Sequence, residues 1–201
     1  MCGEKSGEEG YVEISAYITA GGSSLRFNED KSLYSYHGKP LIRHVYDRLS
    51  ELFPKVCVVA NDAAKYVFLH AEIIPDRIPG LGPLGGLYTA LDHAATEKIF
   101  FCGCDMPCIS AGLIRHMIAL SSDYDVVVPV VPKGYEPLHA VYAKRCLAFV
   151  KDGIESGCRK IIAFYPHIRL KEVAVEEMQR FGNWEEMLCN INYKHEASES
   201  P

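Results

Sequence analysis

The sequence predicts an α/β fold of three layers, in which a mostly parallel sheet with one antiparallel strand lies between two layers of helices. Two observations predict it. Apolar segments of strand length alternate with amphipathic segments of helix length along most of the chain, which is the pattern of consecutive strand–helix units. Late in the chain, a strongly apolar strand is followed by a tight turn and a second strand, which indicates an antiparallel pair. Repeated strand–helix units place their strands parallel and their helices on both faces of the sheet.

Strand signals are short apolar runs that end at turn residues. They lie at 14–19, 55–60, 72–74, 98–104, 125–131 and 169–175. Helical spacing of apolar residues predicts helices at 40–53, 63–70, 87–96, 113–120, 144–155 and 159–165. A turn at 132–135 sends the chain back through a strand at 137–142, and the stretch 79–86, rich in glycine and proline, is expected to be a loop. Residues 179–192 fit neither period clearly.

Length and composition indicate one globular domain. With 201 residues, of which 48% are hydrophobic and 23% charged, the chain is not of the disordered type, and no apolar run approaches the roughly 20 residues of a membrane-spanning helix. The formal net charge of −5 argues against sequence-independent nucleic-acid binding, which needs a basic face. We expect a single domain at 14–193, a segment at 1–13 that is either disordered or an extension, and a disordered tail at 194–201.

The first ten residues are polar and hold no apolar core of a secretion signal, so we expect a cytoplasmic protein. The eight cysteines are then expected to be free thiols, because the chain would stay in a reducing compartment. We also expect a monomer.

Ligands of mostly parallel sheets bind at the carboxyl ends of the strands. Four polar groups follow predicted strands: the loop after Thr19, Asn61, the loop that starts at Asp76, and Asp105. These four groups are therefore expected to share one edge of the sheet.

The loop at 20–31 is expected to bind phosphate. Gly21 and Gly22 allow successive backbone N–H groups to point into one concavity, and Arg26 and Lys31 bring full positive charges to it. It is not a Walker loop, because the required glycine spacing followed directly by Lys and Ser or Thr is absent. The alternative is an ordinary strand-to-helix turn with solvated charges.

Asp105 ends an apolar strand and is followed by a Met-Pro pair, which fixes a tight turn and leaves the carboxylate at the sheet edge. A hard oxygen ligand near a phosphate-binding loop suits Mg²⁺ at a nucleoside triphosphate site; the alternative is an N-cap of the next helix. Asn61 and Asp76 are candidates for recognition of a base or ribose, since a carboxylate accepts well from the N1–H and N2–H₂ groups of guanine. Either residue is equally compatible with a turn.

Two other patterns carry less weight. Gly80, Gly82 and Gly85 match the dinucleotide fingerprint, but no strand leads directly into the first glycine. His139 lies on a predicted strand, where it either faces the cleft or belongs to the core.

Three cysteines lie close together in the sequence: Cys102, Cys104 and Cys108. They lack the paired CxxC spacing and the fourth ligand of a structural zinc site, so buried strand cysteines are expected.

Six segments, in their order and spacing, closely resemble the molybdenum cofactor guanylyltransferases of the MobA family. They are Thr19-Ala20-Gly21-Gly22-x-Ser24-x-Arg26 with Asp30-Lys31, Gly38-Lys39-Pro40-Leu41, Gly82-Pro83-Leu84-x-Gly86, Cys104-Asp105-Met106-Pro107, Glu136-Pro137-Leu138-His139-Ala140 and Asn190-Ile191-Asn192. The resemblance covers about residues 14–193 and implies the three-layer α/β/α nucleotidyltransferase fold, which is Rossmann-like. The double glycine after Ala20 favours guanylyl over cytidylyl members.

The resemblance implies transfer of GMP from Mg·GTP to the phosphate of molybdenum-bound molybdopterin, with release of pyrophosphate and without a protein nucleophile. Catalysis would then consist of positioning and charge neutralisation. The implied catalytic residues are Arg26, Lys31 and Asp105, of which Asp105 also holds Mg²⁺. The implied nucleotide-binding residues are Thr19, Ala20, Gly21, Gly22, Lys31, Asn61, Asp76, Gly82 and Asp105. On the pterin side they are His139, Arg159, Lys160, Asn190 and Asn192. Transient contacts with cofactor-insertion proteins and molybdoenzyme chaperones are a further implication.

The sequence departs from the family pattern at two places. Asn28 stands where the family usually has Gly, although Asn tolerates a left-handed backbone better than most residues. Tyr193 and Lys194 replace the usual Thr-Pro. Two alternatives therefore stay open: a related transferase with another base or acceptor, such as cytidylyl transfer to the same pterin or a sugar-phosphate guanylyltransferase, and a nucleotide-binding protein without transferase activity.

Overall fold

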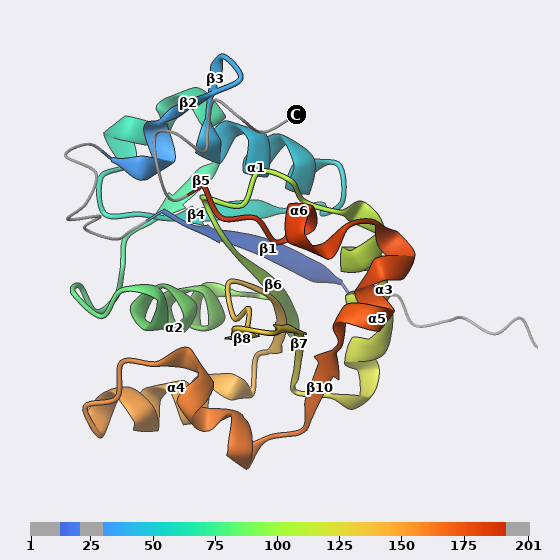
Figure 1. Ribbon diagram of the computed structural model, residues 1–201. Helices are drawn as coiled ribbons and strands as arrows, with labels where there is room; N and C mark the ends of the chain where they lie inside the picture. Colours follow the sequence, from blue (N-terminus) through green and yellow to red (C-terminus); the bar gives the residue numbers. More distant parts are fainter. Residues whose placement is uncertain (1–12, 21–29, 192–201) are drawn as a thin grey trace, which may run out of the picture.

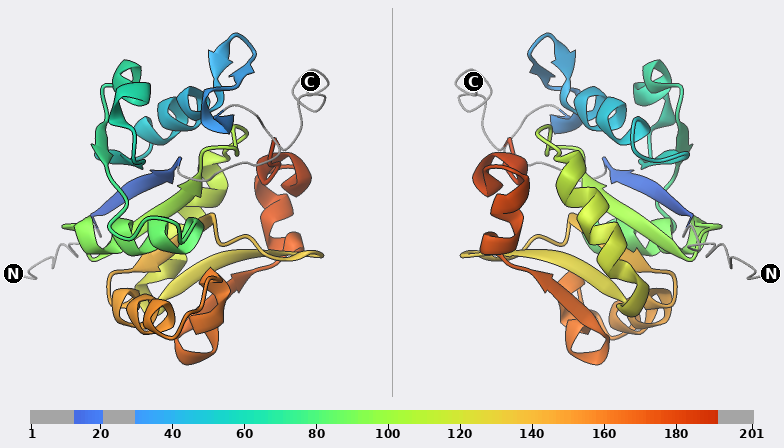
Figure 2. Two further views of the ribbon diagram at one scale, coloured as in Figure 1. Left: turned by 90° about the vertical axis from the view of Figure 1, so that its left-hand side faces the viewer. Right: turned by 90° about the vertical axis from the view of Figure 1, so that its right-hand side faces the viewer.

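The computed structural model describes residues 13–20 and 30–191, and Figure 1 shows how their elements are arranged. One twisted sheet runs through the middle, with helices on both of its faces (Figure 2). The three-layer α/β fold with a mostly parallel sheet is thus confirmed.

The main sheet has eight strands, in the spatial order β10-β7-β9-β6-β1-β4-β5, with β8 paired to β7. Its strands are β1 (Ile14–Thr19), β4 (Val56–Val59), β5 (Glu72–Ile74), β6 (Lys98–Gly103), β7 (Val126–Val131), β8 (Gly134–Tyr135), β9 (His139–Ala143) and β10 (Leu170–Val173). A separate hairpin, which the sequence did not predict, consists of β2 (Ser35–Tyr36) and β3 (Lys39–Pro40).

Strand directions follow the prediction. β1 is parallel to both β4 and β6, β4 is parallel to β5, and β7 is parallel to β10. β9 lies between β6 and β7 and is antiparallel to both. Because β9 runs in the opposite direction, its first residues meet the carboxyl ends of the parallel strands.

The helices divide between the two faces of the sheet (Figures 1 and 2). One face is covered by α1 (Leu41–Ser50), α3 (Ala111–Leu120), α5 (Val175–Met178) and α6 (Trp184–Met187), and the other by α2 (Pro83–His93) and α4 (Cys146–Glu155). Short 3-10 helices connect them: η1 (Lys31–Leu33), η2 (Ala63–Leu69), η3 (Ser121–Asp123), η4 (Ile161–His167) and η5 (Gln179–Phe181).

Each face of the sheet has its own apolar core, because successive strand side chains point to opposite faces. Ile18 and Phe100 belong to the core under α1 and α3. Tyr17 and Phe101 belong to the core under α2 and α4. The central strands are buried on both sides, so that six of six residues in β1 and in β6 are buried.

Helix α2 begins earlier than predicted. Gly82, with a φ of 58°, precedes the helix and Pro83 is its first residue, where the missing N–H of proline is not needed. The prediction of a loop through residue 86 is therefore wrong. The helix instead contains Gly86, at which an added Cβ would lie 2.8 Å from Oγ1 of Thr19. The glycine allows α2 to approach the end of β1 closely.

The predicted helix at 63–70 is a 3-10 helix. Its two buried residues, Tyr66 and Leu69, are three positions apart, which suits a helix with three residues per turn. It ends at His70, whose φ of 54° is left-handed. The stretch 179–191, which fitted no period, consists of η5, α6 and an irregular end at Asn190 and Ile191.

Candidate active site

The carboxyl ends of β1, β4, β5 and β6 are joined to one another by backbone hydrogen bonds. The Ala20 N–H donates to the Val59 carbonyl (3.0 Å), and the Ala60 N–H donates to the Ile74 carbonyl (2.9 Å). On the other side of β1, the Cys104 N–H donates to the Thr19 carbonyl (3.2 Å). The residues that follow these strands therefore meet at one edge of the sheet, as the sequence predicted.

An ion pair joins two of the predicted catalytic residues at this edge. Nζ of Lys31 lies 2.5 Å from Oδ2 of Asp105, and the two side chains are 14% and 20% exposed. Asp105 is not the N-cap of α3, since Ser110 has that position and accepts a hydrogen bond from the Leu113 N–H. The carboxylate of Asp105 thus contacts Lys31 at the edge of the sheet and does not cap a helix.

Lys31 is positioned by the residue before it. Asp30 caps η1: its carboxylate accepts hydrogen bonds from the backbone N–H (3.2 Å) and the hydroxyl (2.6 Å) of Ser32. It also accepts from Nζ of Lys65 (3.1 Å). Burial alone would raise the pKa of Asp30, but the hydrogen bonds from Ser32 and Lys65 outweigh it and lower the pKa. Asp30 therefore stays ionised and anchors the start of η1.

Tyr66 connects both described ends of the loop at 21–29. Its hydroxyl lies 2.9 Å from Oγ of Ser32 and 3.5 Å from the Ala20 carbonyl oxygen. The end of β1 and the start of η1 are consequently held to the same side chain of η2. The predicted phosphate-binding residues Gly21, Gly22 and Arg26, together with Asn28, lie outside the described residues.

Asn61 and Asp76 form one pair rather than two separate turn residues. Nδ2 of Asn61 donates to Oδ2 of Asp76 (3.3 Å), and the backbone N–H of Asp76 donates to Oδ1 of Asn61 (2.9 Å). Oδ1 of Asp76 is buried and has no hydrogen-bond partner among the described residues. Burial raises the pKa of Asp76, and the hydrogen bond from Asn61 only partly offsets this. The pair presents one unused buried acceptor at the end of β5.

Helix α2 packs against the end of β1 at this edge of the sheet. Thr19 is 7% exposed and lies against Gly86 of α2, while the N–H of Arg77 donates to Oγ1 of Thr89 on the same helix (3.0 Å). The segment after Asp76 is thereby tied to α2, whose first turn follows Gly82 at the site.

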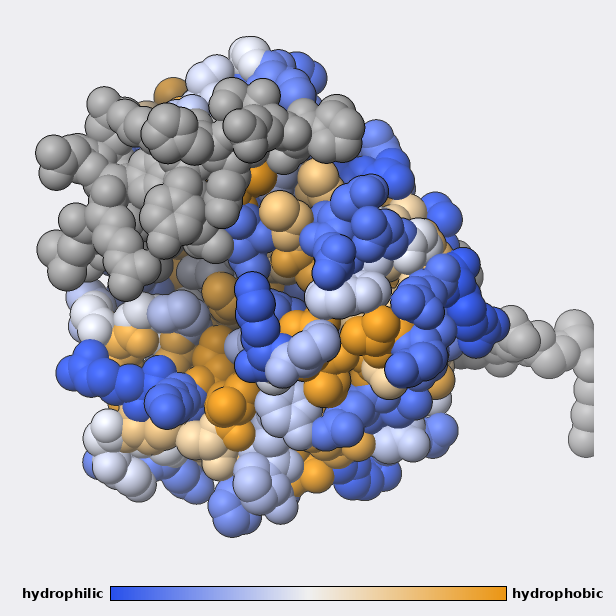
Figure 3. All heavy atoms as spheres, viewed as in Figure 1, coloured by the Kyte–Doolittle hydropathy of each residue, from blue (hydrophilic) through white to orange (hydrophobic). Residues whose placement is uncertain are grey.

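A cavity of about 280 Å³ adjoins the edge. Its walls come from α2, from β8 and the connection to β9, and from the start of η4 with the two residues before it: Pro83, Tyr135, Pro137, Leu138, Arg159, Lys160, Ile161 and Ile162. Most of this lining is apolar, and Figure 3 shows apolar side chains at the surface between α2 and β8. Nη1 of Arg159 donates to the Gly80 carbonyl (2.9 Å), so η4 is fastened to the loop before α2. The structure thus places the predicted Arg159 and Lys160 in one cavity.

Asn190 is close to Asp105 in the structure. The N–H of its neighbour Ile191 donates to the Asp105 carbonyl (3.0 Å), and Ile191 packs with Tyr36 and Leu41 in a small apolar cluster. The predicted pterin-side residues are therefore divided between two places, with Arg159 and Lys160 at the cavity and Asn190 beside Asp105. Asn192 lies outside the described residues.

His139 does not face the cleft, and the expectation that it contacts a substrate is corrected. It is 0% exposed and packs edge-on against Phe100, with ring centroids 5.1 Å apart. The physical reason is strand alternation: His139 points to the same face as Val141, which belongs to the core under α1 and α3. Neither ring nitrogen has a partner among the described residues, and burial lowers the pKa of His139 to about 4.

Sequence reasoning did not single out Glu136 as a site residue. Its side chain is half-buried in the connection between β8 and β9. Burial raises its pKa, and the negative charge of Asp105 raises it further. The sequence feature that could have pointed to Glu136 is its position just before the antiparallel strand, which begins at the carboxyl edge of the sheet.

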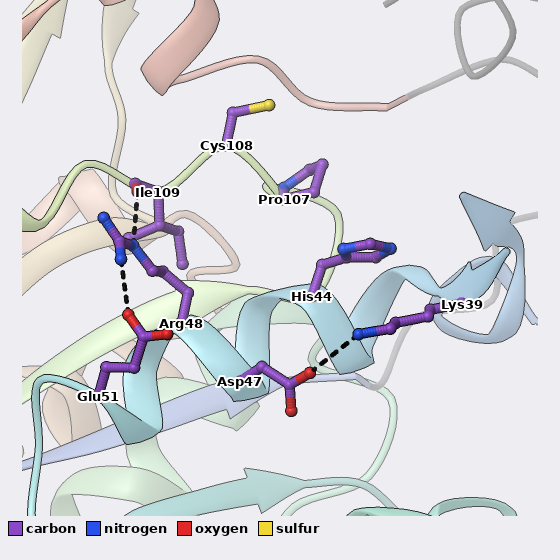
Figure 4. Close-up of a pocket in the computed structure, with 8 residues that line it drawn as sticks. All are labelled: Lys39, His44, Asp47, Arg48, Glu51, Pro107, Cys108 and Ile109. Atoms are coloured by element: carbon purple, nitrogen blue, oxygen red, sulfur yellow. Dashed lines mark hydrogen bonds and ion pairs between the residues drawn. The ribbon is translucent and has the colours of Figure 1, made fainter. Parts of the chain in front are cut away.

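A second, larger pocket of about 380 Å³ lies between α1 and the segment 107–109, which follows Asp105. Figure 4 shows its charged side chains, which are Asp47 and Arg48 on α1, Lys39 on β3 and Glu51 at the end of α1, and their pairing with one another. Arg48 bonds to Glu51 (2.6 Å) and to the Ile109 carbonyl (3.4 Å), and Lys39 lies 3.8 Å from Asp47. Arg48 thus joins α1 to the 107–109 segment, whereas the Lys39–Asp47 pair joins β3 to α1.

Three further features concern the described residues as a whole. They include no group of three or more His, Cys, Asp or Glu side chains arranged to hold a metal ion. Their seven cysteines are free thiols, as predicted. The expectation of buried strand cysteines holds for Cys102 but is wrong for Cys104, which is half-buried, and for Cys108, which is exposed, because β6 ends before both of them. No helix among them has the length and apolar character needed to cross a membrane.

A family model and curated relatives agree on the family of this chain. Residues 16–173 match the model of the MobA-like NTP transferase domain. Proteins named as probable molybdenum cofactor guanylyltransferases from Pelotomaculum thermopropionicum and Carboxydothermus hydrogenoformans are each 34% identical, over 90% and 89% of this chain and 88% and 90% of theirs.

Solved structures share the fold. Molybdopterin-guanine dinucleotide biosynthesis protein A from Archaeoglobus fulgidus has a TM-score of 0.79 at 24% identity, covering 92% of this chain and 95% of that one. The bifunctional IspDF of Campylobacter jejuni has a TM-score of 0.69 at 16% identity, covering 92% of this chain and 53% of that one. The match at residues 16–173 and the identity to the two relatives show that the chain belongs to the MobA-like NTP transferase family.

Proposed function

We propose that the chain is a molybdenum cofactor guanylyltransferase, which moves GMP from GTP onto the phosphate of molybdenum-bound molybdopterin. Family membership and the names of relatives at 34% identity support this. The observation that carries the proposal is the joint position of the Lys31–Asp105 ion pair and the Asn61–Asp76 pair at one sheet edge. The first pair suits a triphosphate and the second suits a base.

The reaction needs no protein nucleophile. A phosphate oxygen of molybdopterin attacks the α-phosphorus of GTP, and a new P–O bond forms as the bond from the α-phosphorus to the α,β-bridging oxygen breaks. Pyrophosphate leaves with that electron pair. The protein therefore has two tasks, alignment of the two substrates and neutralisation of the charge that accumulates on the phosphates. Lys31 is held in place at the start of η1. It and Arg26 would bring positive charge to the phosphates.

The donors at Asp105 fit a metal that arrives with the nucleotide. Mg²⁺ prefers oxygen ligands and is usually held by one or two carboxylates together with substrate phosphates and water. The described residues contain no larger ligand cluster, and Asp105 offers one carboxylate beside Lys31. When bound there, Mg²⁺ would supply charge neutralisation to the phosphates; Asp105 would hold it, and Lys31 would turn from Asp105 to the phosphates.

Asp76 favours guanine over the other bases. Guanine presents two neighbouring donors, N1–H and N2–H₂, and a carboxylate accepts two parallel hydrogen bonds. Oδ1 of Asp76 is buried without a partner, and Asn61 fixes Oδ2. A buried acceptor without a partner is unfavourable, and a guanine base would satisfy it. Cytosine carries one amino group and no adjacent ring N–H, so it would fill this acceptor pair less well.

The acceptor would lie in the cavity that contains Arg159 and Lys160. Its apolar walls suit a flat ring system, and its two cations suit an anionic substituent. Asn190 and Asn192 would contact the acceptor from the side of Asp105.

A base panel tests this function. The purified protein is incubated with Mg²⁺, molybdenum-bound molybdopterin and GTP, CTP or ATP, and pyrophosphate release is measured. We expect release with GTP that depends on the pterin. Turnover with CTP instead of GTP would favour cytidylyl transfer, turnover with GTP and a sugar phosphate would favour another acceptor, and nucleotide binding without turnover would favour a non-enzymatic role.

A further inference from the structure

One acidic side chain at the carboxyl edge has no task in the proposed transfer. The backbone of Glu136 is held on both sides, because its N–H donates to the Pro129 carbonyl (3.0 Å) and its carbonyl accepts from the His139 N–H (3.0 Å). The next turn of chain is fixed to β6, since the Gly103 N–H donates to the Leu138 carbonyl (3.0 Å). Glu136 is therefore placed by the backbone, close to the end of β6.

The side chain of Glu136 meets a like charge and lacks a partner. It is half-buried and interacts with the negative charge of Asp105, which the positive charge of Lys133 only partly offsets. Among the described residues, no hydrogen bond or ion pair involves its carboxylate. Such an arrangement is unfavourable in the free protein, and a ligand that donates hydrogen bonds would relieve it.

Glu136 is also close to both parts of the site. One part is Asp105, beside which the α-phosphorus of the nucleotide would be placed. In the other part, the two residues that follow Glu136 in the chain, Pro137 and Leu138, line the cavity that contains Arg159 and Lys160. An acceptor that reaches from this cavity to the α-phosphorus would therefore lie near Glu136.

We propose that Glu136 is a positioning residue that binds the acceptor through hydrogen bonds from N–H or O–H groups. An ionised carboxylate only accepts hydrogen bonds, so the acceptor class it selects is a heterocycle that carries N–H donors next to its anionic arm. The inference rests on the proposed function and extends it, since it assigns the end of the acceptor nearest the reacting phosphate. Glu136 sets the direction of that phosphate toward the α-phosphorus.

The test compares Glu136→Gln with Glu155→Gln. Both substitutions change the net charge equally, and Glu155 is an exposed residue of α4. In Glu136→Gln we expect the KM for molybdopterin to rise about tenfold or more, because a hydrogen bond to a charged group is among the stronger ones, whereas the KM for GTP stays within about twofold. Glu136→Asp, which keeps the charge, should recover part of the loss. Glu155→Gln should behave as the wild type.

Each other outcome contradicts the proposal. A molybdopterin KM within twofold of the wild type in Glu136→Gln would remove Glu136 from the acceptor site. A loss of Mn²⁺ affinity with an unchanged molybdopterin KM would make it a metal ligand instead. Thermal unfolding of each variant shows whether it folds. If Glu136→Gln does not fold, the affinity of the folded Glu136→Asp variant for molybdopterin, measured by calorimetry, tests the proposal instead. Absence of turnover in the wild-type protein would refute the guanylyltransferase proposal itself, which is a separate result.

Discussion

The ammonium group of Lys31 and the carboxylate of Asp105 form a direct ion pair, with 2.5 Å between Nζ and Oδ2. The pair joins the start of η1 to the segment after β6, which are 74 positions apart in the sequence. A cation bound to the nucleotide would need the same carboxylate. Under the proposed function, Lys31 and the metal ion would compete for Asp105 in the free protein, and binding of the metal would release Lys31 toward the phosphates.

Lys31→Met is expected to strengthen metal binding to the free protein and to weaken nucleotide binding. A partly exposed ion pair contributes up to about 1 kcal/mol, so its removal should raise the Mn²⁺ affinity about two- to fivefold. The KM for GTP should rise, because the phosphates lose a positive charge. Electron paramagnetic resonance of free Mn²⁺ measures the first effect and steady-state kinetics the second. Unchanged Mn²⁺ affinity would show that the two cations do not share Asp105.

Asp76→Asn is expected to raise the KM for GTP about 10- to 100-fold, because a hydrogen bond to a charged group contributes about 1.5–3 kcal/mol. The preference of the protein for GTP over ATP should fall as the KM for GTP rises. Burial raises the pKa of Asp76, so the carboxylate gains a proton at a higher pH than an ordinary Asp. GTP affinity of the wild type should therefore weaken as the pH is lowered through this raised pKa, and Asp76→Asn should lack that decrease. Fluorescence titration at several pH values checks both, and an identical pH profile in the variant would contradict the assignment.

Gly86→Ala is expected to destabilise the fold. The new Cβ would lie 2.8 Å from Oγ1 of Thr19, and such overpacking costs about 1–3 kcal/mol. Gly153→Ala in α4 is the matched control, since its nearest neighbour would be 3.9 Å away and alanine is the better helix former. Urea unfolding should show a loss of stability for the first and a small gain for the second. Equal stabilities of the two variants would contradict the close approach of α2 to β1.

His139 is expected to make stability fall as the pH is lowered. Its pKa is about 4 in the folded protein because it is buried, against 6.5 for an ordinary histidine. Between these values the unfolded chain binds a proton that the folded protein does not, so stability rises with pH in this window. About 3 kcal/mol should be lost between pH 6.5 and 4.

His139→Leu should remove this component, and His167→Leu, at an exposed position, should leave it unchanged. Urea unfolding at pH 7 and pH 5 measures the difference. The same pH dependence in His139→Leu as in the wild type would show that His139 does not titrate in this way.

The parallel strands and their common edge could be predicted from the sequence because they depend on local patterns. Apolar runs such as 14–19 and 98–104 end at polar residues, and the rule for parallel sheets then places Thr19 and Asp105 at one edge. The start of α2 could not be predicted in this way. Gly85 and Gly86 read as loop residues, and their place in a helix follows from the packing of α2 on β1, which is a long-range contact.

Side-chain direction limited the prediction of the site. His139 was placed on the correct strand, but the face to which it points depends on register with β6, in which it lies opposite Cys102. In the same way, Asn61 and Asp76 were recognised separately, whereas their hydrogen bonds to each other depend on the pairing of β4 with β5. Glu136 belongs to one of the segments that resemble the family, but no role follows from the sequence, because its interaction with Asp105 joins residues that are distant in the sequence.

The most direct test of guanylyl transfer follows the two ends of the triphosphate. GTP labelled at either the α- or the γ-phosphorus is incubated with Mg²⁺, molybdenum-bound molybdopterin and the wild-type protein or Asp105→Asn, and the products are separated. The account predicts that the wild type places the α-label in a pterin dinucleotide and the γ-label in pyrophosphate, whereas folded Asp105→Asn forms neither product. Appearance of the γ-label in the pterin product, or full activity of Asp105→Asn, would contradict it.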